Sequence, residues 1–157
     1  MNRWRALGAL DTASLLRWGI LGIAFLGVAG TSAELLFLRH WQGTLQLIVW
    51  PVMVTLAIAL ALVVIRPTPR RLVIARVLAA IVLVFAGIGV LIHLNENIQS
   101  GYLDQDYAAT WGTTGFIEQA WLAFTGSVGP APTLAPAAIA WTALTVLLAT
   151  IRHPADQ

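Results

Sequence analysis

The chain has 157 residues, of which 59% are hydrophobic and only 10% are charged. Soluble domains usually carry about 25% charged residues, so this composition indicates a membrane protein, expected to form one domain over residues 1–157. The absence of cysteine excludes disulfides, thiolate metal sites, iron–sulfur clusters and thiol catalysis. The net charge is only +2 and the basic residues, all arginine, are dispersed, so no nucleic-acid partner is expected.

Four segments approach the length of about 20 apolar residues that a helix needs to cross the hydrocarbon core. They are residues 18–38, 45–65, 72–94 and 134–151. Pro130, Pro132 and Pro136 suit the entry into the last helix, which is the shortest. The sequence therefore predicts an all-α integral membrane protein, a four-transmembrane-helix bundle whose surroundings are the lipid bilayer. This pattern resembles small four-span proteins of bacterial inner membranes, a likeness that adds no mechanism.

The first span has a second interpretation. Arg3 and Arg5, an apolar run and the small residues of AGTSA are also the pattern of a secretory signal peptide. The apolar run continues to Leu38, beyond those small residues, which favours an uncleaved span. Ahead of it, NRWRALGAL is a candidate interfacial helix, and Asp11 is a good cap for the helix that follows.

The arginines predict how the chain crosses the membrane. If the N-terminus is cytoplasmic, eight of the nine arginines lie at the inner side and only Arg39 lies outside. Eight arginines against two acidic residues then give +6 inside, and one arginine against five acidic residues gives −4 outside. By the positive-inside rule this distribution favours a cell inner (plasma) membrane location with both termini cytoplasmic. Trp18, Trp41 and Trp111 fall near predicted boundaries, as an aromatic belt would.

The one long connection is the predicted outer loop over residues 95–133. Loops longer than about 12–15 residues are usually functional or disordered, and the aromatic content of this one argues for order. The segment GFIEQAWLAFTG predicts a short helix between Gly115 and Gly126, with Phe116 and Phe124 on one apolar side. This helix would lie in the membrane interface or cap the bundle. Its apolar side would form either a packed lid or one wall of an outward-facing cleft.

The first span also carries several glycines, at positions 19, 22, 27 and 30. Small residues allow helices to approach closely in lipid, where no hydrophobic force drives their association. These glycines predict close packing either inside the bundle or against other membrane protein subunits, including a second copy of the chain. The sequence alone does not separate these two possibilities.

Glu34 lies within the apolar length, about one turn from the outer end of the first span. A charged side chain at a helix centre costs about 2.5–3.5 kcal/mol on insertion scales, and less near an edge. In one interpretation Glu34 pairs with Arg39 or bonds to Thr31. In another it binds a ligand or carries a proton in a small transporter or channel.

Polar residues close the third span in the stretch GVLIHLNENIQSGY. His93, Glu96 and Asn97 have i, i+3 and i+4 spacing and share one face of a helix. Together with Glu34 and His40, predicted at similar depth, His93 and Glu96 are candidate ligands for zinc, iron, manganese or copper, and two histidines could hold a haem. The alternative is a polar helix end, in which an asparagine satisfies the last carbonyls.

The sequence contains no G-x-S-x-G, P-loop or H-E-x-x-H motif. The leading hypothesis is therefore a small, non-enzymatic integral subunit or accessory protein of a larger membrane complex. A metal- or haem-binding protein with its site at the outer face is the second hypothesis. A small transporter or channel that uses Glu34 is the third.

Overall fold

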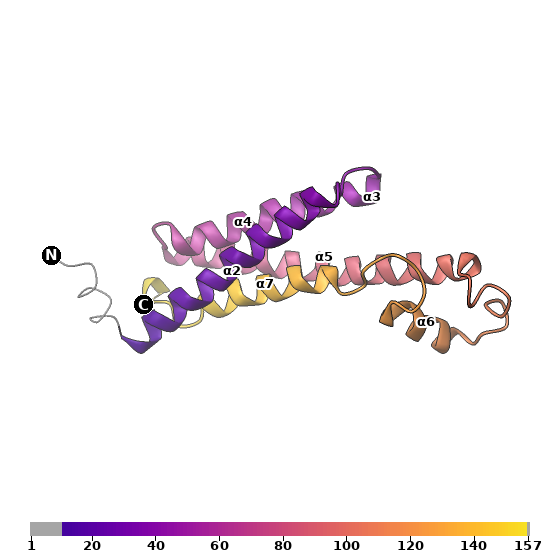
Figure 1. Cartoon of the computed structure of the whole chain (residues 1–157). Helices are drawn as coiled ribbons and strands as arrows, with labels where there is room; N and C mark the ends of the chain where they lie inside the picture. The colour runs from indigo at the N-terminus through magenta and orange to yellow at the C-terminus, as the bar shows by residue number, and fades with distance from the viewer. Residues whose placement is uncertain (1–10, 157) are drawn as a thin grey trace. The chain divides into compact units, whose positions relative to one another are not determined.

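The computed structural model describes residues 11–156, and these residues form helices and connecting segments without any strand (Figure 1). The α-helices are α2 (Thr12–Phe37), α3 (Thr44–Leu47), α4 (Val49–Val64), α5 (Pro69–Ser100), α6 (Phe116–Thr125) and α7 (Ala135–Ala149). Two 3-10 turns complete the described chain, η1 (Gly101–Leu103) and η2 (Pro154–Asp156). The all-α prediction is confirmed for this range, and the predicted N-terminal interfacial helix lies outside the described residues.

Three helical segments are long and apolar enough to cross a membrane: Thr12–Phe37, Thr44–Val64 and Pro69–Leu103. They correspond to the first three predicted spans and indicate a multi-pass membrane protein. The fourth predicted span corresponds to α7, an apolar helix of 15 residues. At 1.5 Å per residue α7 is about 22 Å long, which is shorter than the hydrocarbon core of about 30 Å.

The chain divides into two compact units. Among the described residues, the first unit is built from residues 11–83 and 141–156, and the second from residues 84–140. Both α5 and α7 therefore contribute residues to each unit. Each unit has buried side chains of its own, and the two are described separately below.

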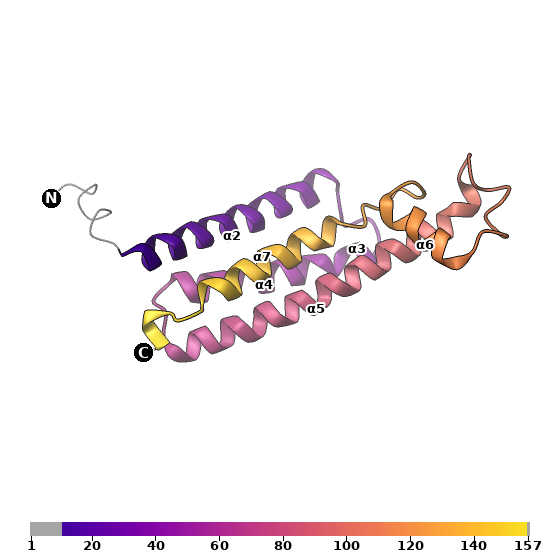
Figure 2. The same cartoon turned by 90° about the horizontal axis from the view of Figure 1, so that it is seen from below.

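In the first unit, α2 packs on α4, and Figure 2 shows both running along the C-terminal part of α7. The buried side chains are aliphatic or small, among them Leu21, Ala24, Leu56, Ala75 and Ala143. Alanine and glycine at such contacts let the backbones approach closely. Gly27 is the clearest case, because a Cβ atom there would lie 2.3 Å from Oγ1 of Thr142 on α7.

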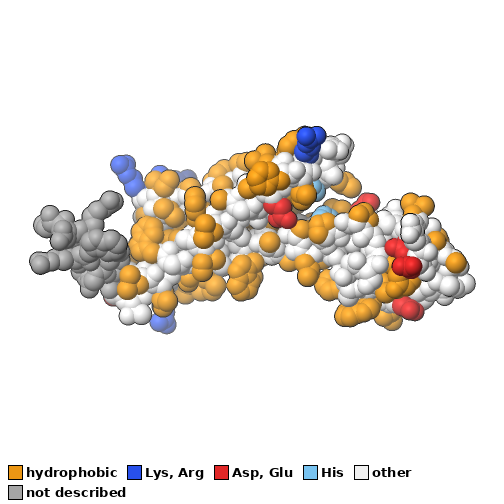
Figure 3. All heavy atoms as spheres, viewed as in Figure 1, with side chains coloured by type: hydrophobic (Ala, Val, Ile, Leu, Met, Phe, Trp, Pro, Cys, Tyr) orange, Lys and Arg blue, Asp and Glu red, His pale blue; other side chains and the backbone are white. Residues whose placement is uncertain are grey.

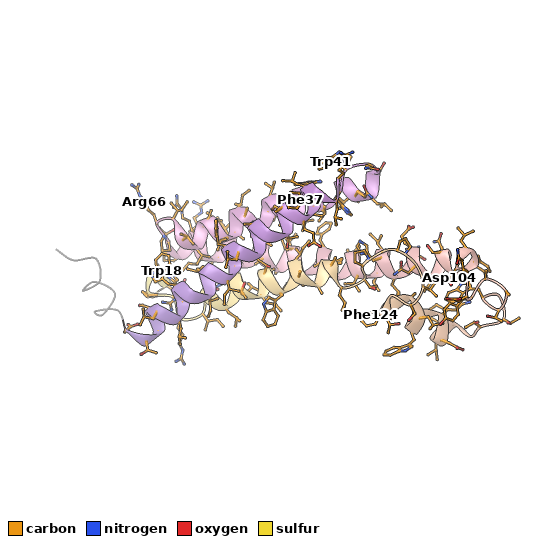
Figure 4. All side chains as sticks on the ribbon, viewed as in Figure 1. Trp18, Phe37, Trp41, Arg66, Asp104 and Phe124 are labelled. Carbon is orange, nitrogen blue, oxygen red and sulfur yellow. The ribbon has the colours of Figure 1, made fainter. Side chains whose placement is uncertain are left out.

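Outside this core, the helices present hydrophobic side chains on their outer surfaces (Figure 3). Figure 4 shows Trp18 and Arg66 toward one end of the first unit, and Phe37 and Trp41 toward the opposite end. Aromatic and arginine side chains at the ends of apolar helices are typical of membrane–water interfaces.

Local chemistry explains where the helices begin. The Asp11 carboxylate accepts a hydrogen bond from the Ser14 backbone N–H (2.7 Å), confirming the predicted N-cap of α2. The break between α3 and α4 falls three residues before Pro51, which has no N–H to bond the Leu47 carbonyl. Thr68 caps the start of α5 through its hydroxyl, and Pro69 occupies the first helical position.

The ends of α2, α4 and α7 differ from the usual pattern, in which glycine adopts the left-handed conformation. Three arginines have positive φ instead: Arg39 (50°) after α2, Arg66 (48°) after α4 and Arg152 (45°) after α7. A left-handed conformation costs a residue with a side chain about 1–2 kcal/mol. These positions follow apolar helices, where a long cationic side chain can reach the polar side of the interface.

In the second unit, α5 continues to Ser100, so the first six residues of the predicted loop are helical. The short predicted helix is confirmed as α6, with Gly115 as its N-cap and Gly126 in the left-handed conformation (φ 76°) at its end. Trp111 is fully buried, and its indole N–H donates to the Ile98 carbonyl (3.0 Å). It therefore forms part of the core of this unit and not of an aromatic belt.

Candidate functional site

The polar stretch at the end of the third span holds the long connection in place. Asn97 is fully buried, its Nδ2 donates to the carbonyls of Ala123 (3.0 Å) and Ala131 (2.8 Å), and its Oδ1 accepts from the Ala131 N–H (2.8 Å). Nδ1 of His93 lies 2.8 Å from the Pro132 carbonyl. Because a carbonyl only accepts, Nδ1 of His93 carries the proton and donates it.

Gly129 completes this contact. A Cβ atom at this position would lie 2.3 Å from Oδ1 of Asn97 and 2.6 Å from its Cα, and φ is +83°. No residue but glycine fits there without displacement of the backbone. Glu96 is exposed. His93 and Asn97 therefore serve the packing of the second unit, which favours the structural interpretation of these two residues.

The four candidate metal ligands are distributed over both units. Glu34 lies on α2 and His40 in the turn that follows it, where the His40 carbonyl accepts from Nε1 of Trp50 (2.8 Å). His93 and Glu96 belong to the second unit. Within residues 11–156, no group of three or more His, Asp or Glu side chains is placed to hold a metal ion. The Nδ1–carbonyl bond of His93 is the kind that orients metal-binding histidines, and a metal or haem at the outer face stays a prediction.

Glu34 is exposed on α2, three residues before the helix ends. Among residues 11–156 its carboxylate makes neither the expected ion pair with Arg39 nor a hydrogen bond to Thr31. Glu34 thus presents a carboxylate at the surface of an apolar helix, a position that is costly for a charged group if it faces lipid alone.

The face of α2 that carries Glu34 includes three glycines, with the exposed Leu26 between Gly22 and Gly30 on the same face. With 3.6 residues per turn, Gly19, Gly22, Gly30 and Glu34 fall within about 120° of one another. Side chains on the opposite face, such as Leu21 and Leu35, are buried. A Cβ atom added at Gly19, Gly22 or Gly30 would meet nothing within 4 Å. We call Gly19, Gly22, Gly30 and Glu34 the glycine face. Within residues 11–156, Gly27 is the one glycine of α2 at which an added Cβ would meet another helix.

A second cluster lies at the opposite end of α2, where Arg17 and Arg76 bind the end of α7. Arg17 donates from Nε to the Ala149 carbonyl (3.2 Å) and from Nη2 to the Arg152 carbonyl (3.1 Å). Arg76 donates to the Thr150 carbonyl (2.8 Å) and hydroxyl (3.0 Å), and it forms an ion pair with Asp156. These cations satisfy carbonyls that a helix end leaves without partners.

The same chemistry ends α4, where Nη1 of Arg71 donates to the carbonyls of Ile65 (2.8 Å) and Arg66 (3.1 Å). The positions of these arginines in the sequence predict only the orientation of the chain in the membrane. The spacing between an arginine and a distant helix end gives no signal in a single sequence, so their capping role was missed.

His153 belongs to this cluster and is only 7% exposed. Burial, followed by the neighbouring Arg17 charge, lowers the pKa of its imidazole. Its Nδ1 accepts from the Ala155 N–H (3.1 Å), so the neutral ring carries its proton on Nε2.

Comparison of the chain with protein-family models, curated proteins and solved structures found no match.

Proposed function

We propose that the chain is a small, non-enzymatic subunit of a larger membrane assembly, which it joins by docking the glycine face of α2 against a helix of a partner protein. The observation that carries this proposal is the unfilled glycine face with Glu34 at its end. A second helix can approach the α2 backbone closely at these glycines, and the exposed Leu26 between them offers apolar surface to the same partner.

Glu34 defines what this partner helix has to offer. A carboxylate near the end of an apolar helix is stabilised by a cation or a hydrogen-bond donor at the same depth. We therefore expect the partner helix to present an Arg, Lys, His, Ser or Thr side chain about three turns from the level of Gly22, since 12 residues separate Gly22 from Glu34 and each turn has about 3.6 residues.

In this proposal α2, α3–α4, α5 and α7 form a four-span bundle with both termini on the cytoplasmic side. The described arginines support this orientation, because all of them except Arg39 lie near the start of α2, the connection from α4 to α5 or the end of α7. The short α7 spans together with the residues on either side of it, beginning at Leu134 and ending near Ile151.

We further propose that α6 lies in the outer interface of the membrane. Ile117, Trp121 and Phe124 are 85%, 64% and 39% exposed and share one side of α6, while Ala123 on the other side is buried. Asn97, which bonds the Ala123 carbonyl, follows the last predicted apolar residue of the span by three residues, about 4.5 Å along the helix. That depth corresponds to the headgroup region, where the apolar side of an amphipathic helix is buried.

Cysteine crosslinking tests the docking face directly, because the chain contains no cysteine of its own. The test variants are Gly22→Cys and Gly30→Cys on the glycine face. The matched controls are Ile58→Cys on α4 and Val84→Cys on α5, two exposed positions on other helices. Each variant is treated in native membranes with a maleimide that carries a photoreactive diazirine, which inserts into any nearby side chain on irradiation, and is analysed by mass.

The expected result is a crosslinked product from Gly22→Cys and Gly30→Cys and none from the controls, with a mass that identifies a different protein. A product of twice the chain mass would show that the glycine face docks on a second copy of the chain and not on a different protein. Equal crosslinking of all four variants, or none, together with a lone monomer in mild detergent, would overturn the docking proposal.

A further inference from the structure

A cavity of about 210 Å³ lies in the first unit, where the start of α2, the end of α4 and the turn η2 meet. Its polar lining includes Arg17 and His153, and its apolar lining includes Trp18, Leu21 and Val63. This division into a cationic part and an apolar part distinguishes it from a surface depression between charged side chains.

The donors available at the cavity suit an anion. Arg17 uses Nε and Nη2 on the carbonyls of Ala149, Ile151 and Arg152 at and after the end of α7, and among the described residues its Nη1 makes no hydrogen bond. Nε2 of the neutral His153 ring carries a proton, because Nδ1 accepts from Ala155. Of the nearby acidic groups, Asp156 is paired with Arg76 and Asp11 caps α2. A planar guanidinium beside an imidazole N–H matches the oxygens of a phosphate group.

The apolar lining of the cavity favours a phosphate that is part of a phospholipid over a free phosphate ion. A free phosphate ion would gain nothing from Trp18, Leu21 and Val63, whereas the glycerol and first acyl carbons of a phospholipid would be buried against them. Basic pockets between membrane helices are a known mode of binding for anionic lipid headgroups. The further arginines at this end, Arg66 and Arg152, add a field that attracts anionic lipid.

We propose that this cavity binds one anionic phospholipid, with its phosphate held by Arg17 and His153 and its glycerol end against Trp18 and Leu21. The bound lipid would fill the junction of α2, α4 and the C-terminal turn. The lipid site requires neither the partner protein nor the crossing direction proposed above. The lipid site and the docking of the glycine face are therefore tested by separate experiments.

The test measures lipid bound to the purified full chain by native mass spectrometry, with phosphatidylglycerol, phosphatidylcholine and inorganic phosphate added separately. We expect phosphatidylglycerol to bind at least about tenfold more tightly than phosphatidylcholine, because both carry a phosphate but only the choline cation of phosphatidylcholine is repelled by Arg17 and the neighbouring arginines. Inorganic phosphate at the same concentration should not displace it.

Three variants locate the site. Arg17→Gln should reduce the preference for phosphatidylglycerol about tenfold, equivalent to about 1.4 kcal/mol. The matched control is Arg70→Gln, which removes the same charge at an exposed position that does not line the cavity, and it should change binding less than twofold. Val64→Trp fills the cavity from its half-exposed rim and leaves the α7 cap and the charge intact, so it should also abolish the preference.

Val64→Trp keeps the proposal falsifiable if Arg17→Gln does not fold. Equal losses from Arg17→Gln and Arg70→Gln would mean general attraction to a basic surface and would overturn the site. Full displacement by inorganic phosphate would reassign the cavity to a free anion. Equal binding of both lipids would overturn the proposed selection of an anionic lipid.

Discussion

At the scale of single residues, the second unit depends on one buried amide. Asn97 makes three hydrogen bonds to the backbone of the chain that follows α5, and it does so without any contact with solvent. A buried amide in this position satisfies carbonyl and N–H groups that would otherwise lack partners. The chain from Ala123 to Pro132 is therefore fixed to α5 through the side chains of Asn97 and His93.

We predict that Asn97→Ala destabilises the second unit by about 2–4 kcal/mol, because each backbone group left without a partner costs about 1–3 kcal/mol. The measurement is the rate of proteolysis or of hydrogen exchange in residues 101–133. Asn95→Ala is the control, since Asn95 is the same residue type, lies on the same helix and is exposed. Equal effects of the two substitutions would contradict the role assigned to Asn97.

A second prediction separates backbone strain from packing at two glycines. Gly126 and Gly129 both have positive φ, but a Cβ at Gly126 meets nothing within 4 Å, whereas one at Gly129 meets Asn97. Gly126→Ala should therefore cost about 1 kcal/mol from conformation alone. Gly129→Ala should cost at least about 2 kcal/mol more, because the clash includes backbone atoms. Thermal unfolding of both variants in one detergent checks the difference.

At the scale of elements, sequence reasoning succeeded where the signal is local. Gly115 and Gly126 gave the limits of α6, and the apolar run gave α2 to within six residues at its start. The contacts of His93 and Asn97 could not be predicted, because a polar helix end and a buried loop anchor have the same spacing on one helix. The capping arginines were missed for a related reason: their partners lie far away in the sequence, as with Arg17 and Ala149.

The end of α7 is the element for which we predict a dependence on pH. The pKa of His153 is lowered in the folded chain, so the unfolded chain binds more protons when the pH is below the ordinary value of about 6.5. Stability is complete above that pH and decreases as the pH falls through 6.5 toward the lowered pKa. The groups that act on His153 are Arg17, Arg76 and Asp156.

The measurement is the melting temperature in detergent between pH 8 and pH 5, as a difference between the native chain and His153→Asn. The Asn side chain keeps an acceptor for the Ala155 N–H but has no proton to gain. The native chain should lose stability relative to the variant only in the acidic part of this range. Parallel curves would show that another group is responsible for any pH effect.

At the scale of the whole molecule, the distribution of charge makes a prediction that needs no partner. Single cysteines are placed at Ser127, in the connection before α7, and at Arg70, near the start of α5; both positions are exposed. A membrane-impermeant maleimide should label Ser127→Cys in intact cells, and Arg70→Cys only after permeabilisation, because basic connections stay in the cytoplasm. The reverse pattern would invert the proposed orientation, and equal labelling would contradict a membrane barrier between the two positions.

The glycine face of α2 has one further consequence, which concerns conformational entropy. Burying a long side chain costs up to about 2 kcal/mol in lost rotamer freedom, whereas glycine has no rotamers to lose. A helix that docks on Gly19, Gly22 and Gly30 meets backbone whose freedom was already given up when α2 folded. Association would still order Glu34 and the exposed side chains on this face, such as Leu26. The glycine positions alone are preorganised, which lowers the contact area that a stable complex needs.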